Sequence, residues 1–198
     1  VWAWVVAVLT WLVPGAASSQ APRQRKTLTL AVGLAIAPYN IPKTQSGLEW
    51  DIVKEALKKE GYTVKPKYVP FARRNMELKN REVDGVLTIN TASGIKAFYS
   101  DVHLVCENVV VALAKNDFHI RHPTDLADKS VVAFQDATLY LGDEFAAMAK
   151  GNSEYREMAK QELQVNLLYS GRTDAIVLDK NIFFYHRARN NLVDTSQP

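Results

Sequence analysis

The alternation of strand-like and helix-like segments over residues 27–89 constrains the fold of this chain more than any other feature. Residues 27–32 pass from alternating polarity into an apolar run, as a strand entering a buried sheet does. Residues 48–59 repeat apolar side chains at helical spacing, with acidic residues in the first turn and lysines in the last. The segments that follow predict a strand at 63–69, a short helix at 72–80 and a strand at 85–89. Strand, helix and strand in this order predict an α/β fold with a mostly parallel sheet flanked by helices.

The second half of the chain repeats this order. We expect a strand at 130–134, a helix at 139–150, a helical stretch at 155–170, a strand at 175–178 and a helix at 181–189. In both halves a leucine is followed by an aspartate, a small residue and an apolar strand: Leu78 precedes Asp84, and Leu168 precedes Asp174. The repeat predicts two similar α/β lobes, over residues 27–112 and 113–198. The apolar run at 108–115 is long enough to be a strand that crosses between them.

The opening of the chain differs in composition from the rest. Residues 1–22 carry no ionisable side chain, and from Val1 to Val13 only Thr10 is polar. Small residues follow, which is typical of the end of a secretory signal peptide. We therefore predict a signal peptide over residues 1–21 and a periplasmic protein; an uncleaved membrane anchor is the alternative.

Composition and motifs argue against several function classes. The net charge is only +3 and the basic residues are interleaved with acidic ones, so no nucleic-acid partner is expected. The single cysteine, Cys106, excludes an internal disulfide, and its apolar neighbours predict a buried thiol. His119 and His122 lack a third ligand nearby, so no metal is expected. Neither a nucleophile elbow nor a phosphate-binding glycine loop is present, so we expect no catalytic residues and no cofactor.

Five short runs, in their order and spacing, resemble the signature of the family 3 bacterial extracellular solute-binding proteins. They are GLEWDI at 47–52, VDG at 83–85, YSD at 99–101, TDLADKSV at 124–131 and GRTDA at 171–175. The resemblance implies a monomer with two α/β lobes that close on a small solute, which is delivered to an ABC permease or sensed by a receptor. Members of that family usually continue past the point where this chain stops, so the C-terminal end of the first lobe is expected to be missing.

Ligands of parallel α/β sheets bind outside the carboxyl ends of the strands, which selects candidate residues in the first lobe. Tyr39 lies in the loop after the first strand, where it is either a wall of the site or part of a surface turn. Phe71 matches a family position that stacks on the ligand; a hydrophobic staple is the alternative. Thr88, Asn90 and Thr91 form a hydroxyl and amide cluster after the third strand, which suits a carboxylate or amide ligand.

The family match adds candidates in the rest of the chain. Lys96 stands where amino-acid-binding relatives have an arginine that clamps the ligand carboxylate, and a lysine is not an equivalent fork. Gln135 and Thr138 lie in a turn that faces the ligand in the family, although Asp136 replaces the usual glycine there. Asp179 matches the family acid that receives a ligand ammonium, or it caps the following helix.

These observations predict capture of a small polar solute, amino acid-like or amine-bearing, for delivery to an ABC permease. An extracytoplasmic sensor domain is the alternative. A dehydratase on the same fold is a third possibility, for which Glu49 and Asp179 are the acids to test.

Overall fold

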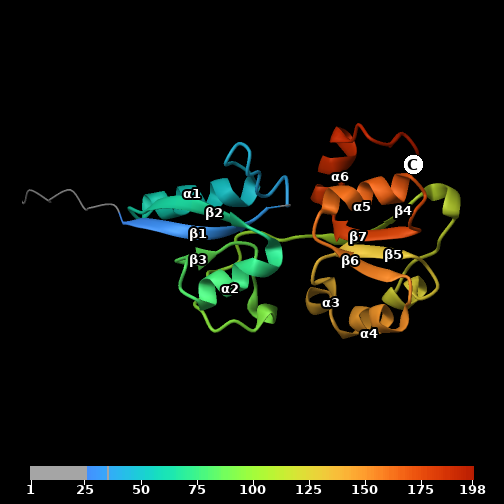
Figure 1. The fold of residues 1–198 in the computed structure, drawn as a ribbon, viewed down its shortest axis with the longest axis horizontal. Coiled ribbons are helices and arrows are strands. Elements are labelled where there is room, and N and C mark those ends of the chain that lie inside the picture. Colours follow the sequence, from blue (N-terminus) through green and yellow to red (C-terminus); the bar gives the residue numbers. More distant parts are fainter. Residues whose placement is uncertain (1–25, 35) are drawn as a thin grey trace, which may run out of the picture.

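The computed structural model describes residues 26–34 and 36–198. The predicted signal peptide at 1–21 lies outside the described residues. Two α/β lobes, one from each half of the chain, lie side by side along the longest axis of the molecule (Figure 1).

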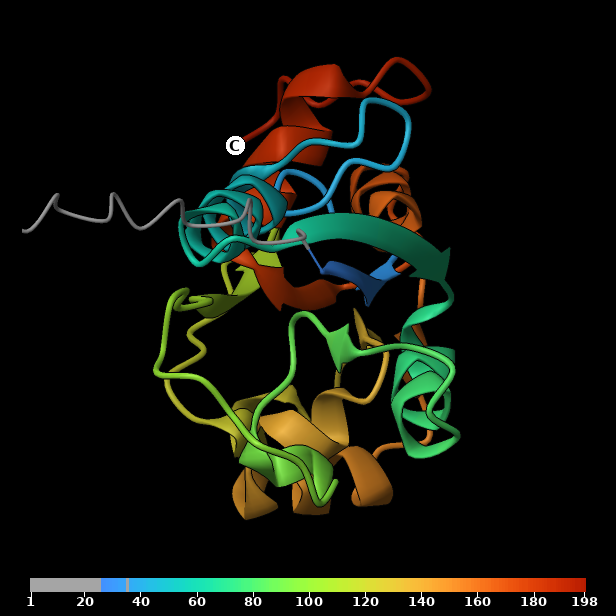
Figure 2. The ribbon, with the colours of Figure 1, turned by 90° about the vertical axis from the view of Figure 1, so that its left-hand side faces the viewer.

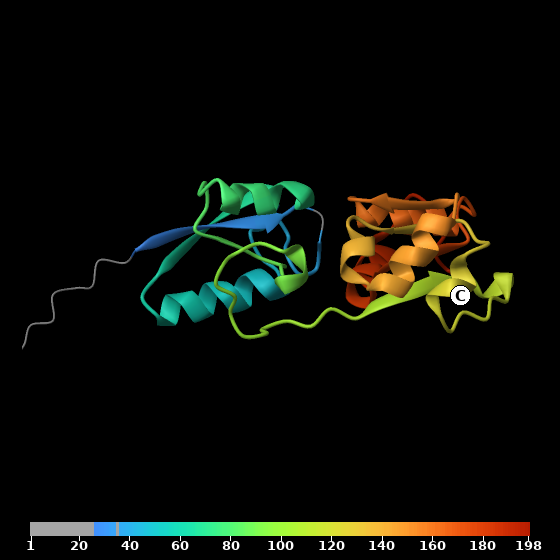
Figure 3. The same cartoon turned by 90° about the horizontal axis from the view of Figure 1, so that it is seen from below.

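The first lobe is built on a three-stranded parallel sheet of order β2-β1-β3. Its elements in chain order are β1 (Thr27–Gly33), α1 (Leu48–Lys59), β2 (Thr63–Val69), η1 (Phe71–Arg73), α2 (Arg74–Lys79), β3 (Gly85–Val86) and η2 (Thr91–Ser93). Helices α1 and α2 cover opposite faces of the sheet (Figure 3). Trp50 of α1 packs on Leu30 and Val32 on one face, whereas Leu78 of α2 packs with Ala31 on the other. Successive side chains of β1 point to opposite faces of the sheet, so the strand packs against α1 on one face and α2 on the other.

The second lobe is built on a four-stranded sheet of order β4-β7-β5-β6, in which only the β4–β7 pair is antiparallel. Its elements are β4 (Asn108–Ala112), η3 (Ala114–Asn116), η4 (Pro123–Leu126), β5 (Val131–Phe134), α3 (Ala137–Tyr140), α4 (Asp143–Gly151), β6 (Tyr155–Met158), α5 (Gln161–Tyr169), β7 (Ala175–Asp179) and α6 (Lys180–Arg189). Every residue of β7 is buried, as expected for a central strand covered on both faces.

The structure corrects four sequence predictions. Residues 155–158 are not helical but form β6, because β5 offers them a full set of parallel pairing partners. The helix expected at 139–150 is two helices, interrupted at Gly142 with its φ of 87°. The third strand of the first lobe is only two residues long. Strand β4 pairs with β7, so it belongs to the second sheet and not to the first lobe, where the predicted boundary after residue 112 had placed it.

Contacts between the two lobes include two regions on opposite sides of the interface. The loop after β1 brings Ile36 and Tyr39 into one apolar cluster with Leu178, Ile182 and Phe183 of the second lobe. On the opposite side of the interface, η2 lies beside α3. Viewed end-on, both contacts are visible: the blue loop lies in front of the red α6, and green η2 lies in front of the orange helices (Figure 2).

Candidate ligand-binding site between the two lobes

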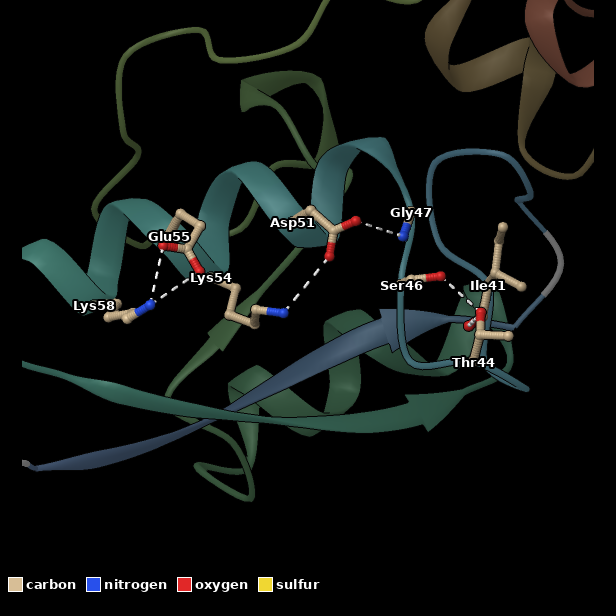
Figure 4. Close-up of polar contacts among 8 residues, drawn as sticks. All are labelled: Ile41, Thr44, Ser46, Gly47, Asp51, Lys54, Glu55 and Lys58. Carbon is tan, nitrogen blue, oxygen red and sulfur yellow. Dashed lines mark hydrogen bonds and ion pairs between the residues drawn. The ribbon is translucent and has the colours of Figure 1, made fainter.

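The loop that carries Tyr39 is tied to the start of α1. The backbone N–H groups of Leu48 and Glu49 donate to the carbonyl oxygens of Pro38 and Tyr39, both at 3.1 Å. Gly47 has a φ of 136°, and a Cβ there would lie 2.3 Å from the Tyr39 carbonyl oxygen, so only glycine fits. A hydroxyl contact between Thr44 and Ser46 closes the loop, and Asp51 accepts the Gly47 N–H at 3.2 Å (Figure 4). This local order presents Tyr39 to the second lobe.

Asp179, at the carboxyl end of β7, is a junction between three parts of the chain. Its Oδ1 accepts the Tyr39 hydroxyl at 2.8 Å and the N–H groups of Asn181 and Ile182 at 2.9 and 3.1 Å, while Oδ2 accepts the Glu107 N–H at 3.0 Å. The Asn181 amide donates to the Tyr39 hydroxyl at 3.0 Å. Asp179 therefore caps α6, as the alternative interpretation had it, and joins the lobes. Burial raises the pKa of Tyr39, so its hydroxyl stays protonated.

In the first lobe, Thr88 is held by the buried carboxylate of Glu49. The Thr88 N–H donates to Oε1 at 2.7 Å and its hydroxyl to Oε2 at 2.6 Å. Asn40 adds a third donor at 2.7 Å, and His103 lies 3.6 Å away. Thr88 has a φ of 56°, an uncommon conformation for a threonine, and these bonds hold it there after β3 has ended. Glu49 is 1% exposed, so it cannot reach a solute from this position.

The second lobe has a corresponding arrangement, which the sequence did not reveal. Glu157 Oε1 accepts the N–H and hydroxyl of Thr138 at 3.0 and 3.1 Å and the Tyr155 hydroxyl at 2.9 Å, while Oε2 accepts the Asp136 N–H at 2.7 Å. The turn that carries Gln135 and Thr138 thus already binds a carboxylate of its own chain. Tyr155 and Glu157 are two residues apart, a spacing that places both on one face of a strand; interpreting this segment as a helix hid the pair.

Arg74 is a second residue that sequence reasoning missed. It is fully buried at the start of α2, with its guanidinium 3.5 Å over the ring of Phe71. Nε donates to the Phe71 carbonyl at 3.1 Å, and Nη1 donates to the carbonyls of Leu87 and Thr88. Burial lowers its pKa to about 10, against the opposing charges of Tyr140, Glu49 and Asp136. The spacing of Phe71 and Arg74, three residues at a helix start, could have indicated a shared face.

The remaining predicted residues lie at the rim of the first lobe. Asn90 uses its side-chain oxygen to accept the Ala92 N–H at 3.0 Å and so caps η2. Thr91 and Lys96 are exposed, and Phe71 packs against the apolar cluster that the lobes share. The structure thus brings Tyr39 and Asp179 together, and Thr88 beside Arg74, but it leaves Lys96 on the surface.

Cys106 is exposed and not buried as expected, because it lies on the segment that connects the lobes and outside both sheets. Partial burial of its thiol, together with the carboxylates of Asp179 and Glu49, raises its pKa to about 11. A thiol with this pKa is protonated at neutral pH.

Other features of the described residues lie apart from the lobe interface. A hollow of about 340 Å³ between α5 and the C-terminal segment is lined by Met158 and Leu163, and one of about 510 Å³ lies by η3 and η4; neither includes a predicted site residue. Within residues 26–34 and 36–198 no cluster of three His, Cys, Asp or Glu side chains could hold a metal ion. A helix with the length and apolarity to span a bilayer is likewise not found in this described part.

No protein-family model matches the sequence, and no curated protein matches it. Solved structures do. An ancestral arginine-binding protein bound to arginine matches with a TM-score of 0.70 at 22% identity, over 85% of this chain and 76% of its own. A histidine kinase sensor domain with similarity to periplasmic binding proteins matches with a TM-score of 0.71 at 17% identity, over 85% and 74%. An ancestral amino acid-binding protein, a precursor of cyclohexadienyl dehydratase, matches with a TM-score of 0.65 at 18% identity, over 81% and 73%.

Proposed function

We propose that this chain, which has the two-lobed α/β fold of the family 3 solute-binding proteins, captures a small polar solute between its lobes. The observation that supports this most is the convergence of both sheets on one interface. Tyr39, in the loop after β1, meets Asp179 at the end of β7, and the turns after β3 and β5 lie at the same interface. Strand carboxyl ends are where parallel sheets bind ligands, and here two sets face each other.

We assign the solute to the amino acid-like or amine-bearing class. Structural neighbours bound to arginine and to glutamine support this class. Phe71 would form an apolar wall, with the buried Tyr39 in the cluster behind it, while Asn90, Thr91 and Gln135 offer polar groups at the rim. Thr88, Thr138 and Asp179, whose polar atoms are bonded to other protein groups, would position the neighbouring atoms. Binding would stabilise the closed arrangement of the lobes, since only that arrangement surrounds the solute.

After capture, the solute would be delivered from outside the cytoplasm to an ABC permease. The likeness to a histidine kinase sensor domain supports a second fate, in which closure is sensed by a receptor. Catalysis has less support: Glu49, one of the two acids that a dehydratase would use, is buried, and the other, Asp179, already accepts four hydrogen bonds.

A thermal-shift screen of the exported protein against amino acids, amines and organic acids tests the proposal. A ligand at 100 times its Kd adds about 2.7 kcal/mol, which raises Tm by roughly 5–10 °C in a chain of this size. The double variant Thr91→Ala, Gln135→Ala should weaken binding, whereas Ser153→Ala, before the amino end of β6, should not. Recovery of an altered compound would indicate an enzyme. Absence of any shift, or a shift that the double variant leaves intact, would contradict the proposed site.

A further inference from the structure

Four described strands lie at the edges of the two sheets, and β4 is the one whose outer edge its own residues leave unprotected. Strand β2 carries Pro66 between two lysines, β6 carries an arginine and a glutamate, and β3 pairs over only two residues. Proline, charge and short length are the usual means by which an edge strand avoids a partner strand. Strand β4 (Asn108–Ala112) has five residues without proline or charge, and it borders the second lobe (Figure 3).

The hydrogen bonds of β4 show which backbone groups its outer edge presents. Among the described strands β4 pairs with β7 alone, and just before the paired residues the Lys180 N–H donates to the Glu107 carbonyl at 2.9 Å. In an antiparallel pair, successive residues direct their N–H and C=O groups to opposite sides. The even-numbered residues Asn108, Val110 and Ala112 therefore direct theirs away from β7. Elsewhere in the described part of the chain, no backbone group hydrogen-bonds to them.

The side chains along this edge are apolar and partly exposed. Residues 109–111 are all valine, a residue type that favours strand pairing, and Val110 is 37% exposed. The exposed apolar surface continues into the connecting segment, where Val102 and Val105 are 81% and 79% exposed. Exposed apolar side chains beside unpaired backbone groups are the features that a partner strand covers.

The charges at the two ends of β4 fit a second copy of this chain. Glu107, which is 67% exposed and lies 3.4 Å from Lys180, precedes the strand, and the exposed Lys115 follows it. In an antiparallel pair of identical strands, the start of each lies beside the end of the other. A pair centred on Val111 would hydrogen-bond even-numbered residues of both copies and place each Glu107 near the Lys115 of the other copy. Opposite charges in such positions favour pairing, whereas a parallel pair would bring like charges together.

We propose that two copies of this chain pair antiparallel through the outer edges of their β4 strands, and so join two four-stranded sheets into one sheet of eight strands. A two-fold axis at Val111 relates the copies, which makes the contact self-complementary and closes the assembly at a dimer. The contact uses none of the residues proposed to meet the solute, so it does not depend on the proposed function. This dimer differs from the monomer that the family resemblance implies.

Sedimentation equilibrium tests the contact by measuring the mass of the protein over a range of concentrations. A contact this small is weak, so we expect a monomer near about 1 µM and a dimer near about 500 µM. Val110→Lys should raise the dissociation constant by about 10-fold or more, because it places a charge at the centre of the edge. Val110→Pro should do the same, because it removes an outward N–H and no bond to β7. Thr63→Lys, at the start of the other sheet's edge strand β2, is the matched control and should change nothing.

A charge exchange tests the antiparallel arrangement. Glu107→Lys and Lys115→Glu should each raise the dissociation constant by about 5-fold, because each brings like charges together at both ends of the symmetric contact. The double variant restores opposite charges at both ends and should return the dissociation constant to within about 2-fold of the wild type.

The outcomes separate the contact from its alternatives. A protein that stays monomeric up to about 500 µM overturns the proposal, since even a weak edge contact forms there. A dimer that both Val110 variants leave intact also overturns it, because its contact then lies elsewhere. A mass that grows beyond the dimer contradicts the two-fold arrangement. Losses that add in the double variant, without recovery, overturn the antiparallel pairing of Glu107 with Lys115.

Discussion

In each lobe a glutamate carboxylate accepts hydrogen bonds from a threonine that follows a strand of the sheet, but the two glutamates come from different kinds of element. In the first, Glu49 of α1 binds the N–H and hydroxyl of Thr88; in the second, Glu157 of β6 binds the same two groups of Thr138. Glu49 is almost completely buried, whereas Glu157, on an edge strand, is half-buried. Each lobe thus supplies the hydrogen-bond acceptor for the threonine of its own loop. The lobes differ in the charged side chain that lies near that threonine.

That difference is Arg74 on the first lobe against Asp136 on the second. The sheets differ as well. In the second lobe β7 is central and buried along its whole length, whereas β3 of the first lobe pairs over only two residues. The turn at Thr88 therefore follows a strand that has little backbone pairing, and the Glu49 carboxylate holds it instead.

Removing the two carboxylates should give the largest effects and should separate the lobes. Glu49→Ala leaves three donors of the first lobe without an acceptor in a buried site, so we expect a loss of about 3–4 kcal/mol in the free energy of unfolding. Glu157→Ala should cost about 1–2 kcal/mol because water can replace it. Urea denaturation measures both. Glu55→Ala, on the exposed face of α1 (Figure 4), should change less than about 0.5 kcal/mol. Equal losses at Glu49 and Glu157 would contradict the comparison.

Native-state hydrogen exchange should show the difference between the sheets. We expect the amides of β5 and β7 to exchange only through global unfolding, because both strands are paired on two sides. Amides at the end of β3, including that of Leu87, should open at a free energy lower by about 2 kcal/mol, which is roughly 30-fold faster exchange. Uniform protection across both lobes would show that they unfold as one unit.

The bond between the lobes should contribute less. Tyr39→Phe removes the hydroxyl that contacts Asp179 and Asn181, and should cost about 1 kcal/mol. Because the pKa of Tyr39 is raised, the unfolded chain releases this proton first, so the wild type should lose stability relative to the variant as pH rises above about 10. Tyr185→Phe is the control. If Tyr39→Phe has the wild-type Tm, and the two proteins keep the same relative stability at high pH, the Tyr39 hydroxyl does not stabilise the fold.

Neutralising Asp136 should change stability least, and it should stabilise the protein where the other substitutions destabilise it. Burial and the nearby Glu157 raise its pKa, so between about pH 4 and that raised value the unfolded chain ionises first and the folded chain loses stability as pH rises. Asp136→Asn should therefore raise Tm by about 1–2 °C at pH 7 and by less at pH 4. A lower Tm at pH 7 would mean that the carboxylate stabilises the unliganded fold through Arg74.

Much of this architecture is predictable because the local spacing of apolar residues indicates the helices and strands. Helix α1, strand β1 and strand β7 occupy the segments that their apolar spacing indicates. Residues 155–158 were misassigned because a four-residue strand is too short for periodicity to distinguish it from the helix that follows. The candidate site positions came from strand ends and from the family resemblance. Glu157 and Arg74 could not be found that way, because their roles depend on partners 19 to 21 and 13 to 14 residues distant.

The sequence by itself determined the order of elements, the division into two α/β lobes and the strand ends at which a solute would be bound, because those follow from spacing along the chain. Only the tertiary structure decided which polar groups there are already satisfied. A carboxylate such as Glu157 or Asp179 has the same sequence appearance whether it faces a solute or its own protein. The distinction lies in the hydrogen-bond partners that folding brings together, and spacing along the chain does not reveal them.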